Sequence, residues 1–173
     1  MVWPLMLHDL KIRLTSPILG DIQPPAPSAT SIFRLRRGTK NGIVNDVGLW
    51  HYALGEAVKS LRLETLHPDC IRMPDEYRAP SLGIYNRRYQ HPVLKHKWAQ
   101  QFEAISSGAV ITIPIEILAN QSTGEMPSED EVRLAFSWVG KWIGVTQWGH
   151  EFNFGRFNLI SLLPTPQHVP SVS

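Results

Sequence analysis

The segment "AVITIPIEIL", residues 109–118, constrains the fold more strongly than any other part of the sequence. Isoleucine falls on every second position of it, at Ile111, Ile113, Ile115 and Ile117. Because successive side chains of a β-strand point to opposite faces, this period of two predicts a strand with one buried face. Pro114 has no N–H group to donate to a neighbouring strand, so we expect an edge or a bulge at that position.

Two further segments have the period of an amphipathic helix, residues 45–61 and residues 128–144. The first begins with Asn45 or Asp46 as its N-cap. The second begins with a capping box, in which Ser128 is the N-cap and Glu131 follows three residues later. The residues predicted to be buried are Trp50, Ala53, Leu54, Ala57, Val58 and Leu61 in the first helix, and Val132, Ala135, Phe136, Val139, Trp142 and Ile143 in the second.

Alternation also predicts a first strand in residues 8–15, and a last strand in residues 154–164. Prolines divide the segment from 65 to 105 into short runs. Within it, "CIRM" (residues 70–73) and "LGIYNRRY" (residues 82–89) are the candidates for a further strand.

The resulting order is strand, helix, uncertain strand, strand, helix, strand. It predicts an α+β protein of the ferredoxin-like kind, in which an antiparallel sheet carries two helices on one face and long loops are inserted. A length of 173 residues suits a single domain. We expect this domain to span residues 1–164 and to be followed by a frayed tail, residues 165–173.

The charges are unevenly distributed, although the formal net charge is only +2. Residues 22–45 and 77–102 contain no aspartate or glutamate. Their cationic residues are Arg34, Arg36, Arg37 and Lys40 in the first segment, and Arg78, Arg87, Arg88, Lys95 and Lys97 in the second, beside His91 and His96. The second segment also carries Tyr77, Tyr85, Tyr89, Trp98 and Phe102.

Cations that hold phosphates and rings that stack on bases together predict a nucleic-acid surface in these segments. Arg156, in the stretch "WGHEFNFGRF" (residues 148–157), is a further candidate for contacting a ligand. The alternative is a solvated basic loop whose aromatic residues anchor it to the core.

Other classes of function have little support in the sequence. Cys70 is the only cysteine, which excludes an internal disulfide and a four-cysteine zinc site. The seven histidines form no metal-binding motif, and no Walker, GxGxxG or GxSxG motif is present, so we expect neither a metal nor a cofactor. The apolar start lacks a basic region and is interrupted by His8 and Asp9, which predicts neither a signal peptide nor a membrane span. We therefore expect a cytoplasmic protein without a membrane partner.

Three segments carry a family resemblance: "LTSPILG" (residues 14–20), the helix "LWHYALGEAVKSL" (residues 49–61), and the glycine-containing loop "GVTQWGHEFNFGRF" (residues 144–157). Together they resemble the RAMP superfamily of CRISPR-associated RNA-binding proteins, which are built on ferredoxin-like domains. This resemblance implies RNA binding on a RAMP-like or RRM-like fold. The chain also looks like small uncharacterised proteins of tailed phages.

Some of the resembling proteins are repeat-processing endoribonucleases, in which a histidine near the first helix can act as general base on a ribose 2′-hydroxyl. By position, the resemblance assigns this role to His51, with Tyr52 or Lys141 in support.

Three functions are therefore compared. The leading hypothesis is a non-catalytic protein that binds RNA or single-stranded nucleic acid. The alternatives are a phage accessory or structural protein that binds other proteins, and a metal-independent endoribonuclease that uses His51. The choice between RNA and DNA, any sequence preference, and the oligomeric state stay open at this point.

Overall fold

The structure is a computed structural model that describes residues 5–23, 31–146 and 154–166. Its helices are α1 (Val47–Leu61), the short 3₁₀ helix η1 (Pro68–Cys70) and α2 (Glu129–Trp142). Its strands are β1 (Leu5–Leu14), β2 (Ile18–Leu19), β3 (Ile32–Phe33), β4 (Ile43–Val44), β5 (Ile71–Arg72), β6 (Glu76–Tyr77), β7 (Gly83–Gln90), β8 (Lys97–Ile105), β9 (Val110–Leu118) and β10 (Phe157–Pro164). The predicted α+β class is confirmed, with two α-helices and antiparallel sheets among the described residues.

Four strands form the main sheet in the order β10-β1-β9-β5, and every neighbouring pair is antiparallel. The ladder between β1 and β10 contains one irregularity, between Lys11 and Ile12. Strand β5 pairs with β9 only at Ile117 and Glu116. Among the described strands, none pairs with β9 on that side at Pro114, which matches the edge expected there.

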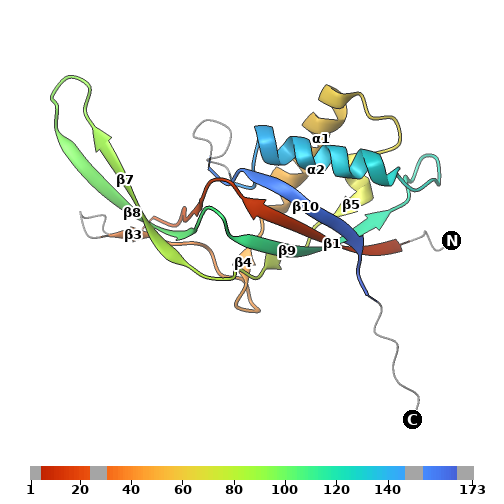
Figure 1. Cartoon of the computed structure of the whole chain (residues 1–173), viewed down its shortest axis with the longest axis horizontal. Coiled ribbons are helices and arrows are strands. Elements are labelled where there is room, and N and C mark those ends of the chain that lie inside the picture. Colours follow the sequence, from red (N-terminus) through yellow and green to blue (C-terminus); the bar gives the residue numbers. More distant parts are fainter. Residues whose placement is uncertain (1–4, 24–30, 147–153, 167–173) are drawn as a thin grey trace, which may run out of the picture.

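The core lies between this sheet and the two helices, which cover the same face of it (Figure 1). The alternating apolar residues of β1 and the isoleucines of β9 point into this layer and are buried. Trp50 of α1 packs against both the other helix and the sheet. Its ring centroid lies 5.8 Å from the ring of Phe136 in α2 and 5.8 Å from that of Phe157 in β10. Helix α2 approaches β10 so closely that a Cβ on Gly140 would lie 2.3 Å from the carbonyl oxygen of Phe157.

Most of the helix residues predicted to be buried are buried, but three predictions are wrong. Val58 is only partly buried, and Leu61 and Trp142 are 37% and 53% exposed. Leu61 and Trp142 are the last residues of α1 and α2. The stripe predicted for α1 therefore continues beyond the part of that helix that has core beneath it. In α2 the core continues to Ile143, which is 4% exposed, and Trp142 lies to one side of the buried face.

The N-cap is predicted correctly in both helices, but the capping box expected in α2 does not form. Asp46 is the N-cap of α1, and its Oδ1 accepts the N–H of Leu49 at 2.9 Å. Ser128 occupies the N-cap position of α2, but its side chain makes no capping hydrogen bond. Glu131, the other half of the expected box, bonds instead to the chain that follows α1. The contact of Glu131 with residues 64 and 65 thus takes the place of the local capping box with Ser128.

Glu131 ties α2 to residues 64–66. Its carboxylate accepts the backbone N–H groups of Glu64, Thr65 and Leu66 at 2.6, 2.7 and 3.0 Å, and also the hydroxyl of Thr65. Desolvation acts to raise the pKa of Glu131, but the hydrogen bonds from Thr65 and the three backbone groups outweigh it. The pKa of Glu131 therefore lies below its ordinary value.

The described start of the predicted tail stays attached to the sheet. Thr165 donates its N–H to the carbonyl of Leu7 at 2.9 Å. Its hydroxyl lies 3.1 Å from Oδ1 of Asp9 and donates to it. Residues 167–173 of that tail lie outside the described residues.

We expect Glu131→Gln to lower the free energy of unfolding by roughly 1–2 kcal/mol at pH 7, because a neutral amide is a weaker acceptor than a carboxylate. The folded-state pKa is the lower one, so the stabilisation is complete above the ordinary value of 4.5 and is lost as the pH falls through the folded-state pKa. Urea unfolding of both proteins at pH 7 and at several values below 4.5 measures this difference, which should shrink with the pH.

Glu129→Gln is the matched control. Glu129 lies in the same first turn of α2, and its Oε1 is 3.0 Å from Nη2 of Arg133, one turn away. An exposed pair of this kind contributes little. Equal losses of stability for the two substitutions would contradict the anchoring role of Glu131.

Candidate nucleic-acid interface

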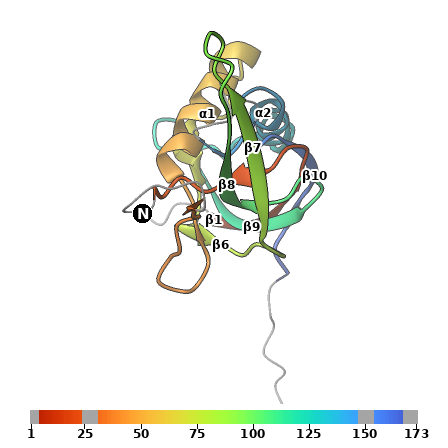
Figure 2. The same cartoon turned by 90° about the vertical axis from the view of Figure 1, so that its left-hand side faces the viewer.

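Strands β7 and β8 form an antiparallel hairpin that projects away from the main sheet (Figure 1). We call residues 83–105 the arm. Figure 2 shows β7 and β8 side by side in front of the main sheet. At the turn, the N–H of His91 donates to the carbonyl of His96 at 2.8 Å, and Lys95 adopts a positive φ of 59°. The segment that the sequence left uncertain therefore contains a long hairpin, and residues 82–89 supply its first strand.

Two short strands hold the root of the arm, on the edge of β8 opposite β7. Strand β2 pairs with β8 antiparallel, and β3 pairs with it in parallel. Gly20, next to β2, donates its N–H to the carbonyl of Glu103 at 2.8 Å. A glycine is needed there, because a Cβ on Gly20 would lie 2.4 Å from the backbone of Arg34.

Glu103 is the only acidic residue of the arm. Its Oε1 accepts the N–H of Leu35 at 3.0 Å, and its Oε2 lies 2.9 Å from Nη2 of Arg37. The side chain of Glu103 is only 13% exposed. This carboxylate thus connects the arm to the segment that follows β3.

Four of the predicted nucleic-acid ligands, Arg34, Arg36, Arg37 and Lys40, belong to this segment. Arg37 is paired with Glu103, and Nε of Arg36 lies 3.4 Å from Oδ1 of Asp21. Arg34 and Lys40 are exposed, and neither forms an ion pair with another described residue. The segment therefore contributes less unbalanced positive charge than its composition predicts.

Side chains alternate between two faces of the arm. The aromatic face, as we name it, carries Tyr85, Arg87 and Tyr89 of β7 opposite Phe102, Gln100 and Trp98 of β8, with Phe33 and Phe154 packed at its root. The polar face, as we name the other, carries Asn86, Arg88, Gln90, Lys97 and Ala99.

Ring and guanidinium groups contact one another along the aromatic face. The ring centroids of Tyr85 and Phe154 lie 5.8 Å apart. The guanidinium of Arg87 lies 5.6 Å from the ring of Phe154 and 4.9 Å from that of Tyr89. Tyr89 and Trp98 are stacked, with centroids 5.4 Å apart and planes 14° apart. The contacts run without a break from the root toward the tip.

Beyond the root of the arm, its cationic side chains have no acidic residue of the arm to pair with. Arg88, Lys95 and Lys97 are exposed, and no ion pair among the described residues includes them. The arm therefore brings together six predicted ligands: Tyr85, Arg87, Arg88, Tyr89, Lys95 and Lys97. A cationic surface of this kind attracts a polyanion.

Sequence reasoning missed the tip of the arm. Val93 and Leu94 are 78% and 64% exposed, the first after Pro92 and the second before Lys95. Two apolar residues within a hairpin turn cannot reach the core. The pair Val93 and Leu94 is visible in the sequence, but its exposure follows only once the pairing of β7 with β8 is known.

Arg156 lies at the end of α2 rather than on the arm. Its Nη1 donates to the carbonyl of Lys141, and its backbone N–H donates to the hydroxyl of Ser16 at 2.8 Å. Burial lowers the pKa of its guanidinium. A cation next to the last carbonyls of a helix is favoured by the helix dipole, which gives Arg156 a structural role.

Among the described residues, no hydrogen bond or ion pair joins any two of the three residues of the endoribonuclease hypothesis. Nδ1 of His51 lies 3.7 Å from Oδ1 of Asp69, in η1 just before β5. Tyr52 is 54% exposed, and Lys141 lies beside Arg156, which precedes β10. Strands β5 and β10 are the two edges of the main sheet. The assignment of catalysis to His51 stays a prediction from the resemblance.

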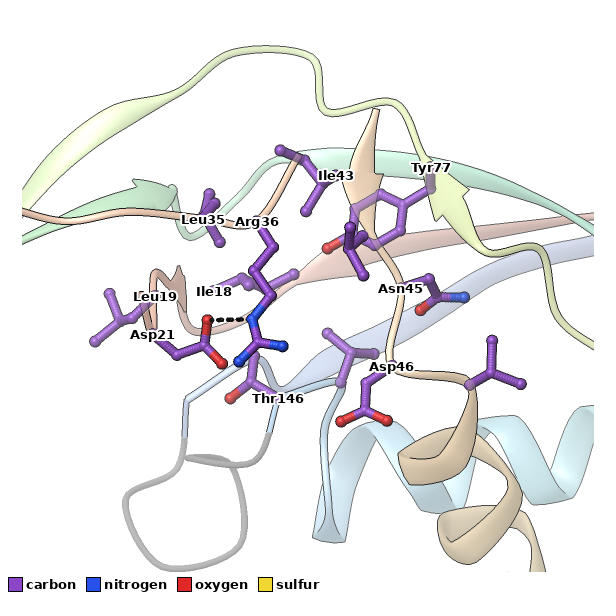
Figure 3. A pocket seen from close by; sticks show the side chains of 13 residues that line it. Ile18, Leu19, Asp21, Leu35, Arg36, Ile43, Asn45, Asp46, Tyr77 and Thr146 are labelled. Atoms are coloured by element: carbon purple, nitrogen blue, oxygen red, sulfur yellow. Dashed lines mark ion pairs between the residues drawn. The ribbon is translucent and has the colours of Figure 1, made fainter. Parts of the chain in front are cut away.

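A pocket of about 360 Å³ lies at the N-terminus of α1 (Figure 3). The ion pair of Asp21 with Arg36 forms part of its wall, and Asp46 and Tyr77 form other parts. Burial raises the pKa of the Tyr77 hydroxyl, so this group stays neutral. The carboxylates of Asp21 and Asp46 line the pocket, and the guanidinium of Arg36 is paired with Asp21. This pocket is therefore a poor site for a phosphate.

Comparisons with known proteins find no matching family model and no matching curated protein. Within the described part of the chain, no helix is both long and apolar enough to cross a membrane. The same residues contain no group of three or more His, Cys, Asp or Glu side chains that could hold a metal ion. Residues 147–153, which include His150, lie outside the described residues.

We expect Glu103→Ala to lower the free energy of unfolding by about 2 kcal/mol, because it leaves the buried N–H of Leu35 without an acceptor and removes the partner of Arg37. Urea unfolding measures the loss, and hydrogen exchange should show faster exchange of the β8 amides at the root. Glu103→Gln, which keeps an acceptor, should lose less. Unchanged exchange in Glu103→Ala would show that this carboxylate does not hold the arm.

Proposed function

We propose that this protein binds RNA or single-stranded nucleic acid through the arm, without catalysing a reaction. The observation that carries the proposal is a projecting hairpin with unbalanced cations, one face of which is a series of aromatic rings. Lysine and arginine neutralise phosphates, and an aromatic ring stacks on any base. Both kinds of contact are therefore available on one element.

We also infer that the main sheet and its two helices form a ferredoxin-like domain. The strand order β10-β1-β9-β5, with α1 after β1 and α2 after β9, supports this inference. Along the chain, each helix connects two strands that are not neighbours in the sheet, because a third strand lies between them. This is the connection of a split βαβ unit. The arm is an insertion between the second and third strands of this domain. This arrangement agrees with the RAMP-like resemblance of the sequence.

We propose the cytoplasm as the place of action. Cys70 is free and buried, and a chain with a single cysteine suits a reducing compartment. The resemblances to RAMP proteins and to tailed-phage proteins both fit the interior of a cell or of an infected cell.

We expect the double substitution Arg88→Ala, Lys97→Ala to weaken binding of single-stranded oligonucleotides. The slope of log affinity against log salt should also become less steep, by about 0.7 for each phosphate contact that is lost. Fluorescence anisotropy of labelled oligouridylate and oligothymidylate between about 50 and about 200 mM salt measures both quantities.

Lys59→Ala is the control for this experiment. Lys59 is an exposed cation on α1, with its Nζ 3.7 Å from Oε1 of Glu56. Its removal changes the net charge by one but should leave affinity and slope nearly unchanged. A wild-type affinity that does not respond to salt would refute the proposed function.

The second candidate function is binding of other proteins, as in a phage accessory or structural protein. The tip of the arm favours it, because Val93 and Leu94 are adjacent apolar side chains exposed to solvent. If this function is the correct one, light scattering at moderate salt should show a defined oligomer, which Val93→Ser, Leu94→Ser dissociates. A monomeric wild-type protein under these conditions argues against self-association through the tip.

A further inference from the structure

We propose that Trp98 is the platform on which one unpaired base stacks, an inference that rests on the nucleic-acid-binding function proposed above. Unpaired bases occur in single-stranded RNA and in single-stranded DNA, and both present the same flat ring to an indole. The proposal thus assigns the stacking contact to one ring of the arm, and the rest of the aromatic face to structure.

Exposure of the rings increases along the aromatic face. Phe102 and Phe154, at the root, are 6% and 9% exposed. Tyr85 and Tyr89 are of intermediate exposure, and Trp98, which lies opposite Tyr89 near the tip, is 50% exposed. The rings at the root belong to a small core, and Trp98 is the ring that a ligand reaches.

Tyr89 holds the indole of Trp98 in a fixed orientation. The two residues are directly opposite in the β7–β8 pairing, with stacked rings. Tyr89 is also in contact with the guanidinium of Arg87. Since Tyr89 lies against one face of the indole, a base on the other face extends a stack that already exists. A ring that is oriented before binding loses little conformational entropy when the ligand arrives.

Exposed cations lie at the same level of the arm as this ring, on its polar face. A shallow hollow of about 550 Å³ on the arm is lined by Trp98 together with Arg88 and Lys97. Its remaining lining residues are Tyr89, Gln90 and Ala99, so none of them is acidic. Arg88 and Lys97 project from the face opposite Trp98, so they attract a polyanion to this part of the arm, and the stacking contact itself rests on the indole.

The arrangement selects an unpaired base over a duplex. Each base inside a duplex is already stacked on its neighbours, and extruding one has an energetic cost that a single-stranded ligand avoids. Tyr85 and Tyr89 are engaged with Phe154, Arg87 and Trp98. The arm thus offers one ring for stacking rather than a row of them.

The test compares oligothymidylate and oligouridylate with abasic oligomers of the same length and charge, bound to the full chain. We expect the wild type to prefer the base-bearing oligomers by roughly 5- to 150-fold. Trp98→Ala should lose this preference and keep its affinity for the abasic oligomers, whereas Trp98→Phe should retain most of it. Trp142→Ala is the matched control, because Trp142 is 53% exposed on α2 and also lies beside a lysine, Lys141.

Tryptophan fluorescence gives a second readout that does not depend on the alanine variant. Stacking of a base quenches indole emission, so the quenching that the wild type shows and Trp98→Phe lacks reports Trp98 alone. No difference between these two proteins would overturn the assignment of the stacking contact to Trp98.

The outcomes separate this inference from the function on which it rests. Equal wild-type affinity for base-bearing and abasic oligomers overturns the role of Trp98 and leaves charge-driven binding by the arm intact. Tighter binding of a duplex than of a single strand also overturns it. Failure of every oligomer to bind refutes the proposed function itself.

Discussion

The position of the arm depends on the contacts at its root, which are the pairing of β8 with β2 and β3 and the carboxylate of Glu103. A two-stranded hairpin is at best marginally stable by itself, so an arm of this length has to be held at its root. Glu103 bonds through one oxygen to the backbone of Leu35 and through the other to Arg37, while its own carbonyl accepts the N–H of Gly20. Because the Glu103 side chain is largely buried, salt screens this ion pair less than it screens the cations farther along the arm.

This contact also divides the basic residues into two groups with different roles. Arg37 is neutralised at the root, where it stabilises the fold. Arg88 and Lys97 lie beyond the reach of any described acid and keep their charge available for a ligand. The aromatic residues divide at the same place, since Phe102 is buried at the root and Trp98 is half exposed near the tip. Unpaired positive charge and the exposure of the aromatic rings therefore both increase from the root of the arm toward its tip.

The fold was predictable wherever one period dominates a segment. Residues 109–118 show this, because only one face of β9 is buried and the isoleucines mark it. Composition likewise marked the cationic and aromatic residues that the structure places on the arm. The hairpin itself was not predictable, since both its faces carry polar groups and its turn places Lys95, not glycine, at a positive φ. Local rules also failed where distant partners compete: three N–H groups bind Glu131, and Glu103 binds Arg37.

The outer edge of β7 has a further consequence. Among the described strands, β7 pairs only with β8, so backbone groups along its other side are open to a second chain. Such an edge is a template for self-association. Two copies that met along this edge would bring Arg87 and Arg88 of one arm against those of the other, and like charges oppose such pairing. On the proposed function, the same cations oppose self-association of the free protein, and a bound polyanion that neutralised them would remove this barrier.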